Sequence, residues 1–150
     1  MITRTALNFA TYILMACALI ACTPTQADRP RCAECGMFAD TMPRWQTGVT
    51  TNEGRALTFD GPKCLVRWLA AHASSARNDA WVIEYYTQAR RLARESFFVI
   101  GADVRGPMGE ELVPISDRAN AERFLREHHA RRILTWQEVT STRDLSTLVR

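Results

Sequence analysis

The chain has 150 residues, of which 47% are hydrophobic and 23% are charged, and its formal net charge is +3. This length suits one modest domain, or two very small units that share a core, and it excludes a larger multidomain protein. The positive excess is too small to indicate nucleic-acid binding, so we expect no nucleic-acid partner.

The first 21 residues are read as an export signal. One charge, Arg4, precedes an apolar run over residues 6–20, which is the layout of a secretory signal peptide. The run is short for a membrane span, which needs about 20 apolar residues. We therefore expect residues 1–21 to be removed when the protein is exported.

The residues around Cys22 indicate how the exported protein is held. The stretch Leu-Ile-Ala-Cys, ending at Cys22, resembles a bacterial lipobox, in which the chain is cut just before an acylated cysteine. We expect lipidation at Cys22, a lipid-anchored linker over 22–31, and a position on the periplasmic face of the outer or inner membrane. Thr23, where an inner-membrane retention signal often has Asp, favours the outer membrane. A soluble exported protein without the lipid remains the alternative.

Residues 46–86 have the pattern of a ββαβ unit. Two β-prone runs flank a Gly-containing turn and predict a hairpin. The stretch Asp60-Gly61-Pro62 then opens a helix, because an acidic or small cap followed by proline in the first turn is typical of helix starts. The expected elements are strands over 46–51 and 56–59, a helix from 62 to about 73, and a strand over 81–86.

The second half repeats this order. A displacement of 56 residues superposes apolar positions of the two halves, such as Phe59 on Ile115. Because a unit this small cannot bury its apolar face alone, we expect an α+β fold of two stacked homologous ββαβ units, 32–86 and 96–139. The second unit is expected to contain a strand over 96–101, a Gly/Pro loop, a strand over 112–115, a helix capped by Ser116-Asp117, and a strand over 132–136.

Two segments lie outside these units. Residues 87–95 fit either a short helix or an irregular linker, and the pattern does not choose between them. Residues 140–150 are read as a tail.

Three cysteines remain in the body of the mature chain: Cys32, Cys35 and Cys64. Cys17 leaves with the signal and Cys22 carries the lipid. An odd number of thiols in an oxidising compartment cannot all close as intramolecular disulfides. At least one is therefore free, metal-bound or shared with another chain.

Four features together resemble the NosL family. They are the lipoprotein signal, the Cys-Gly-Met motif at 35–37, the helix start at 60–64 and the Gly-Pro-Met-Gly loop at 106–109. The resemblance covers about 31–139 and implies a pair of ββαβ units similar to organomercurial lyase. It also implies a copper-binding periplasmic lipoprotein, not an enzyme, whose partner is nitrous oxide reductase or its maturation machinery. This chain departs from the family pattern in having three thiols, so its ligand set and its client stay open.

Soft donors near these motifs fit Cu(I). Cu(I) prefers thiolate and thioether ligands, and Cys35 and Met37 supply one of each. Met108 lies in a loop, where neither a helix stripe nor a strand face explains an apolar side chain. Cys64 falls in the first turn of its helix, where the helix dipole favours the thiolate. We expect these four residues to bind Cu(I), with Cys32 as the donor whose loss matters least.

Other functions use the same residues. Cys32, Cys35 and Cys64 with one histidine would form a closed structural zinc site. An organomercurial-lyase-like thiol enzyme needs paired thiolates and a carboxylate, roles open to Cys35, Cys64 and Asp60. A disulfide between Cys32 and Cys35, with Cys64 buried, would give the motif a purely structural role. A thiol-disulfide enzyme is disfavoured, because the Cys-x-x-Cys motif precedes a strand instead of opening a helix.

Overall fold

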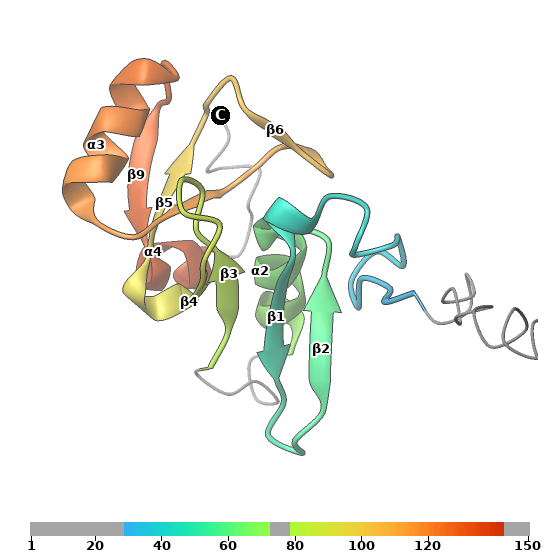
Figure 1. Cartoon of the computed structure of the whole chain (residues 1–150). Coiled ribbons are helices and arrows are strands. Elements are labelled where there is room, and N and C mark those ends of the chain that lie inside the picture. The colour runs from blue at the N-terminus through green and yellow to red at the C-terminus, as the bar shows by residue number, and fades with distance from the viewer. Residues whose placement is uncertain (1–28, 73–78, 143–150) are drawn as a thin grey trace, which may run out of the picture.

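The structure is a computed structural model in which residues 29–72 and 79–142 are described (Figure 1). The predicted export signal, the predicted lipidation site Cys22 and most of the linker lie outside the described residues. In the described part of the chain, no helix is both long enough and apolar enough to cross a membrane.

The first half folds around a four-stranded antiparallel sheet. A 3-10 helix, η2 (Pro43–Trp45), leads into β1 (Thr47–Thr50), which pairs with β2 (Ala56–Phe59) in the predicted hairpin. Helix α2 (Pro62–Ala71) follows and packs on both strands. Strands β3 (Trp81–Ile83) and β4 (Arg90–Leu92) complete the sheet in the order β2-β1-β3-β4.

The second half is built on a three-stranded antiparallel sheet. Its order is β8-β5-β9, with β5 in the centre. A two-stranded hairpin, β6-β7, is inserted between β5 and β8. The elements are β5 (Phe97–Ile100), β6 (Arg105–Gly106), β7 (Gly109–Glu110), β8 (Val113–Ile115), α3 (Arg118–Glu127), β9 (Arg132–Thr135) and α4 (Trp136–Ser141).

The two sheets place their strands in corresponding order. In each, the first strand lies between the strand that follows it and the strand that comes after the helix, and these pairs are antiparallel. Helix α3 begins and ends 56 residues after α2. The α+β class is confirmed, whereas the homology of the two halves stays a prediction.

The segment between the halves differs from both sequence-based alternatives. The predicted strand over 81–86 ends at Ile83, because Glu84 starts a turn in which its carboxylate accepts the N–H of Thr87 at 2.6 Å. Residues 87–95 combine a strand, which neither alternative included, with a short helix at the end of the segment. They contain β4, which pairs with β3, and then the 3-10 helix η4 (Ala93–Glu95).

The end of the described chain also differs. The strand predicted over 132–136 stops at Thr135, because this residue caps α4 in a capping box with Glu138. Helix α4 runs to Ser141, two residues into the segment that the sequence assigns to a tail. Val139 of this helix is fully buried, so α4 belongs to the packed domain.

The main apolar core is shared by both halves. Phe59 and Leu65 come from the first half, Phe98 and Leu134 from the second, and Val139 from α4. A smaller cluster lies under α3. Because burial of apolar side chains is the main stabilising term, the two halves support each other. This shared core holds the junction between β2 and α2, where the predicted cysteine site begins.

Candidate metal centre

A tight turn near the start of the described chain carries the Cys-x-x-Cys motif. The N–H of Cys32 donates to the carbonyl of Met37 at 2.7 Å, and the N–H of Gly36 donates to the carbonyl of Cys32 at 2.9 Å. Gly36 has a φ of +76°, a conformation that residues with a Cβ rarely adopt. The glycine therefore allows the chain to reverse directly after Cys35. The sequence predicts that this motif does not open a helix, and in the structure it lies in a turn.

This turn is attached to the sheet through its backbone. The N–H of Ala33 donates to the carbonyl of Thr58 in β2 at 3.0 Å. The guanidinium of Arg31 donates to the carbonyl of Gly36 at 3.0 Å, and Arg31 also forms an isolated bridge with Phe38. These contacts place Cys32 and Cys35 beside the end of β2.

The junction between β2 and α2 supplies the other two side chains. Asp60 directly follows β2, Gly61 is the N-cap of α2 in an extended conformation, and Pro62 is the first helical residue. Cys64 is then the third helical residue. Its thiol lies in the first turn, at the end of the helix where the helix dipole favours negative charge.

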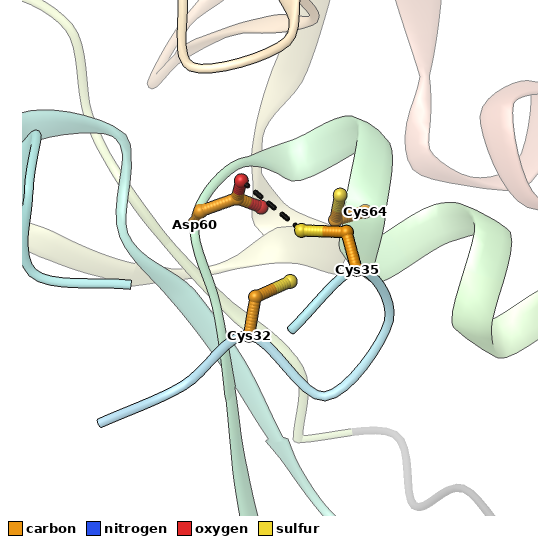
Figure 2. Close-up of side chains that lie close together, drawn as sticks. All are labelled: Cys32, Cys35, Asp60 and Cys64. Carbon is orange, nitrogen blue, oxygen red and sulfur yellow. Dashed lines mark hydrogen bonds between the residues drawn. The ribbon is translucent and has the colours of Figure 1, made fainter. Parts of the chain in front are cut away.

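These four side chains converge on one point. The sulfur atoms of Cys32, Cys35 and Cys64 and a carboxylate oxygen of Asp60 all lie within 4.8 Å of one another. Figure 2 shows them facing each other from the turn and from the start of α2, with the thiol of Cys35 donating to Asp60 at 3.4 Å. All three cysteines are free thiols. We call these four residues the thiol cluster.

The cluster is closed on one side and accessible on the other. Cys32, Cys64 and Asp60 are 3%, 0% and 2% exposed, respectively, whereas Cys35 is exposed. A metal ion held here would be fixed by buried donors and reached through Cys35.

The buried thiols differ in their readiness to ionise. A hydrogen bond from the Cys64 thiol is the main reason that the pKa of Cys32 falls to about 6, although burial opposes this. The same hydrogen bond, together with burial, raises the pKa of Cys64, so the expectation that its place in the first helical turn favours the thiolate is wrong for the metal-free protein. Partial burial raises the pKa of Cys35. In the metal-free cluster Cys32 therefore ionises more readily than Cys35 and Cys64, and these two thiols must lose their protons to bind a metal.

The carboxylate of Asp60 is incompletely satisfied. Its Oδ1 is buried and has no hydrogen-bond partner in the described part of the structure. A buried carboxylate oxygen without a partner is costly, and a cation would satisfy it. Thiolates suit both Cu(I) and Zn(II), and a carboxylate is a usual ligand of zinc. The four side chains therefore fit a thiophilic metal ion.

The methionines lie outside the buried part of the cluster. Met37 is 51% exposed and its carbonyl closes the cysteine turn. Met108 is 37% exposed and lies at the tip of the β6-β7 hairpin. Pro107, beside Met108, lies only 3.7 Å from the place where a Cβ on Gly61 would be, so this hairpin packs against the start of α2. Ligation by the two thioethers stays a prediction.

Two of the three histidines of the described chain have partners away from the cluster. His72 has Nδ1 2.9 Å from the carbonyl of Trp68, and its ring stacks on that tryptophan. His128 has Nδ1 2.7 Å from Asp103. Among the described residues, the thiols are joined by Asp60 and by no histidine. A zinc site with a histidine as its fourth ligand is therefore not formed.

Asp60 is the member of the cluster that the sequence placed mainly in other roles, as a helix cap or as the carboxylate of a lyase. It does not cap α2, since Gly61 is the cap. Its position four residues before Cys64, at the end of a predicted strand, was the sequence feature that could have indicated a place in the cysteine site.

Comparison with known proteins agrees with this architecture. The sequence profile of NosL matches residues 24–143, which is most of the chain. The chain belongs to the NosL family. The crystal structure of the copper chaperone NosL from Shewanella denitrificans is similar to it, with a TM-score of 0.66 and 21% identity, over 73% of this chain and 89% of that protein. At this identity the likeness shows the NosL fold, as predicted. No curated protein matches the chain.

Proposed function

We propose that this NosL family member binds Cu(I) at the thiol cluster and delivers it to a copper enzyme, without being an enzyme itself. The observation that carries the proposal is the convergence of three free thiols, two buried and one exposed. Membership of the NosL family, and the similar structure of a copper chaperone, support it.

The donor set supports Cu(I) as the cargo. Cu(I) favours soft ligands at low coordination number, and the cluster offers three sulfur atoms within reach of one ion. We further propose that the exposed thioethers of Met37 and Met108 serve as additional soft donors; the packing of the β6-β7 hairpin, which carries Met108, against the start of α2 supports this for Met108. The geometry gives no reason to rank Cys32 below the other cysteines, because its sulfur lies inside the cluster and is the most easily ionised.

Delivery requires a site that holds copper against loss and still admits a ligand from the acceptor. Cys32 and Cys64 are buried and would retain the ion, whereas Cys35 is exposed and would exchange first. An acceptor thiol or thioether can then bind copper before the buried thiolates release it. This order avoids free copper ions.

We propose nitrous oxide reductase or its maturation machinery as the client, since the family implies it. The lipobox-like sequence before Cys22 supports anchoring to the periplasmic face of the outer or inner membrane. A denitrifying host that lacks the gene should make nitrous oxide reductase with less copper. Wild-type protein should restore the copper content, and a Cys35→Ser protein should not.

A competition titration tests metal binding directly. The mature chain, residues 22–150 with Cys22→Ser to avoid an extra thiol, is titrated under reducing conditions with chromophoric Cu(I) and Zn(II) probes. We expect one tightly bound Cu(I) per chain. Loss of a residue that only orients a ligand typically lowers metal affinity about 10- to 100-fold. Cys35→Ser removes a ligand itself and should lower the affinity for Cu(I) by more than this. Ala33→Ser, an exposed change in the same turn, is the matched control and should bind normally. A clear preference for zinc would instead indicate a structural site with Asp60 as the fourth ligand.

The kinetics test delivery. If copper leaves by ligand exchange at Cys35, the rate of transfer to a thiol chelator should rise in proportion to chelator concentration. A rate that does not depend on the chelator would show spontaneous release and would contradict the chaperone.

A second candidate function is organomercurial lyase activity. The observation in its favour is that Cys35, Cys64 and Asp60, the residues open to that chemistry, all belong to the thiol cluster. Incubation with phenylmercury acetate and excess thiol distinguishes it. Release of benzene at a catalytic rate, lost in Asp60→Asn, would support the lyase, and stoichiometric mercury binding without benzene would exclude it.

A further inference from the structure

Glu111 is a buried carboxylate that lies beside the thiol cluster without belonging to it. It sits between β7 and β8 in the second half of the chain and is 1% exposed. Its Oε2 has no hydrogen-bond partner in the described part of the structure. Such a group is unfavourable in a protein interior unless something requires it.

Its other oxygen holds the first turn of α2. Oε1 accepts the N–H of Lys63 at 2.8 Å and the N–H of Leu112 at 3.0 Å. Lys63 is the second residue of α2, and the N-cap, Gly61, has no side chain to accept this N–H. Glu111 therefore supplies, from the other half of the protein, the cap that the helix lacks.

Helices α3 and α4 are capped in the usual way. The side chain of Asp117 accepts the N–H of Asn120 at the start of α3. The side chain of Thr135 accepts the N–H of Glu138 at the start of α4. Among these three helices, only the one that carries a cluster cysteine takes its cap from a distant residue.

Two glycines make room for this carboxylate. A Cβ on Gly61 would lie 2.7 Å from Glu111 Oε2, and a Cβ on Gly106 would lie 2.9 Å from Glu111 Cγ. Both distances are shorter than atoms tolerate without movement. Gly61 lies beside Asp60, and Gly106 belongs to the hairpin that carries Met108. The two glycine motifs that stand out in the sequence therefore converge on Glu111.

We propose that Glu111 is a positioning residue for the metal centre. By binding the second residue of α2, it fixes the segment from Asp60 to Cys64 and ties this segment to the Met108 hairpin. The distance between the buried donors then depends on a residue from the other half of the chain. The identity of the metal rests on the proposed function, whereas the positioning of Cys64 does not.

Three variants of the mature chain test this role. Glu111→Ala removes the cap and should weaken Cu(I) binding by about 10- to 100-fold, as loss of a ligand-orienting residue does. In the same background, Gly61→Asp places an N-cap side chain in the space that Glu111 leaves, and it should restore most of the affinity. Asp117→Ala, the matched control, removes the corresponding cap of α3 and should leave copper affinity unchanged.

Two measurements on the metal-free protein report position independently of copper. Hydrogen exchange at the Lys63 amide should quicken in Glu111→Ala and slow again when Gly61→Asp is added. Alkylation of Cys64 by a maleimide should follow the same pattern, whereas Asp117→Ala should alter neither. If wild-type protein binds no Cu(I), the proposed function fails, and these two readouts still decide the role of Glu111.

The inference is overturned by any of three results. Glu111→Ala with normal copper affinity and normal Cys64 alkylation would show that the cap does not position the site. An equal loss of affinity in Asp117→Ala would show a general effect of stability. Failure of Gly61→Asp to restore either readout would show that Glu111 acts otherwise. If Glu111→Ala does not fold, two other variants decide. Glu111→Gln keeps an acceptor for the Lys63 N–H and must retain the affinity for Cu(I) within about 10-fold. The double variant Glu111→Ala with Gly61→Asp must fold and bind Cu(I).

Discussion

Replacement of Glu111 by glutamine should change how the stability of the protein depends on pH. Burial raises the pKa of the Glu111 carboxyl from its ordinary value of 4.5 to about 7 in the folded protein. The backbone N–H groups of Leu112 and Lys63 oppose this rise, as does the Lys63 charge, whereas the charge of Asp60 adds to it. Glutamine has nearly the same shape and does not ionise in this range.

The size and sign of the effect follow from the two pKa values. In the folded protein the carboxyl holds its proton up to about pH 7, and in the unfolded chain only up to pH 4.5. Its contribution to stability is therefore complete below pH 4.5 and is lost as the pH rises to about 7. The difference between the two values corresponds to about 3 kcal/mol.

Urea unfolding of metal-free, reduced wild-type and Glu111→Gln protein at several pH values between 4.5 and 8 measures this quantity. Across that range the free energy of unfolding of the wild type should fall by about 3 kcal/mol relative to the variant. The comparison cancels the titration of the cluster thiols, which both proteins share. Glu95→Gln, which removes one carboxyl at an exposed position, is the matched control.

A constant difference between wild type and Glu111→Gln over this pH range would refute the reasoning. It would mean that the carboxyl ionises in the folded protein as it does in the unfolded chain, so that water reaches it. A difference of the opposite sign would mean that the N–H donors outweigh burial.

Four further outcomes are expected. Two cluster thiols have raised pKa values, and one has a pKa lowered to about 6. Cu(I) binding near pH 7.5 should therefore release about two protons, and the affinity for Cu(I) should rise about 100-fold per pH unit. An affinity that does not change with pH in competition titrations would contradict this. Gly61→Ala should lower the free energy of unfolding by about 1–3 kcal/mol in chemical denaturation through its clash with Glu111; an unchanged free energy of unfolding would show that the carboxylate moves aside. Met37→Leu and Met108→Leu keep side-chain volume and remove sulfur, so each should weaken Cu(I) binding and reduce the sulfur signal in X-ray absorption. Unchanged spectra and affinity for both would leave the cluster thiols as the only sulfur ligands. Cys22→Ala should yield an uncleaved or mislocalised precursor, and normal processing with membrane attachment would disprove lipidation.

Local signals in the sequence were sufficient for most of the secondary structure. The hairpin of β1 and β2 follows from two β-prone runs around a Gly turn, and the proline after Gly61 marks the start of α2 correctly. Each of these features depends on residues within a few positions of one another. The Thr135 capping box that starts α4 is a signal of the same kind, and it was available in the sequence.

Strand β4 required tertiary structure. Residues 90–92 read Arg-Arg-Leu, which has no alternation that predicts a strand. These residues form a strand because they pair with the free edge of β3, where Val82 pairs with Arg91. Propensity cannot reveal a strand whose hydrogen bonds depend on a neighbour.

The sequence by itself determined that the body of the mature chain carries three thiols, two in a Cys-x-x-Cys motif ahead of the first strand and one in the first turn of a helix. Only the tertiary structure decided that they meet, because the Ala33 N–H bonds to Thr58 and so brings the turn to the end of β2. Only the tertiary structure showed Glu111, since its partner Lys63 is 48 residues away in sequence. Helix periodicity, caps and turns act over one or two turns of chain, whereas the meeting of distant side chains depends on strand register and on the packing of the two halves around one core.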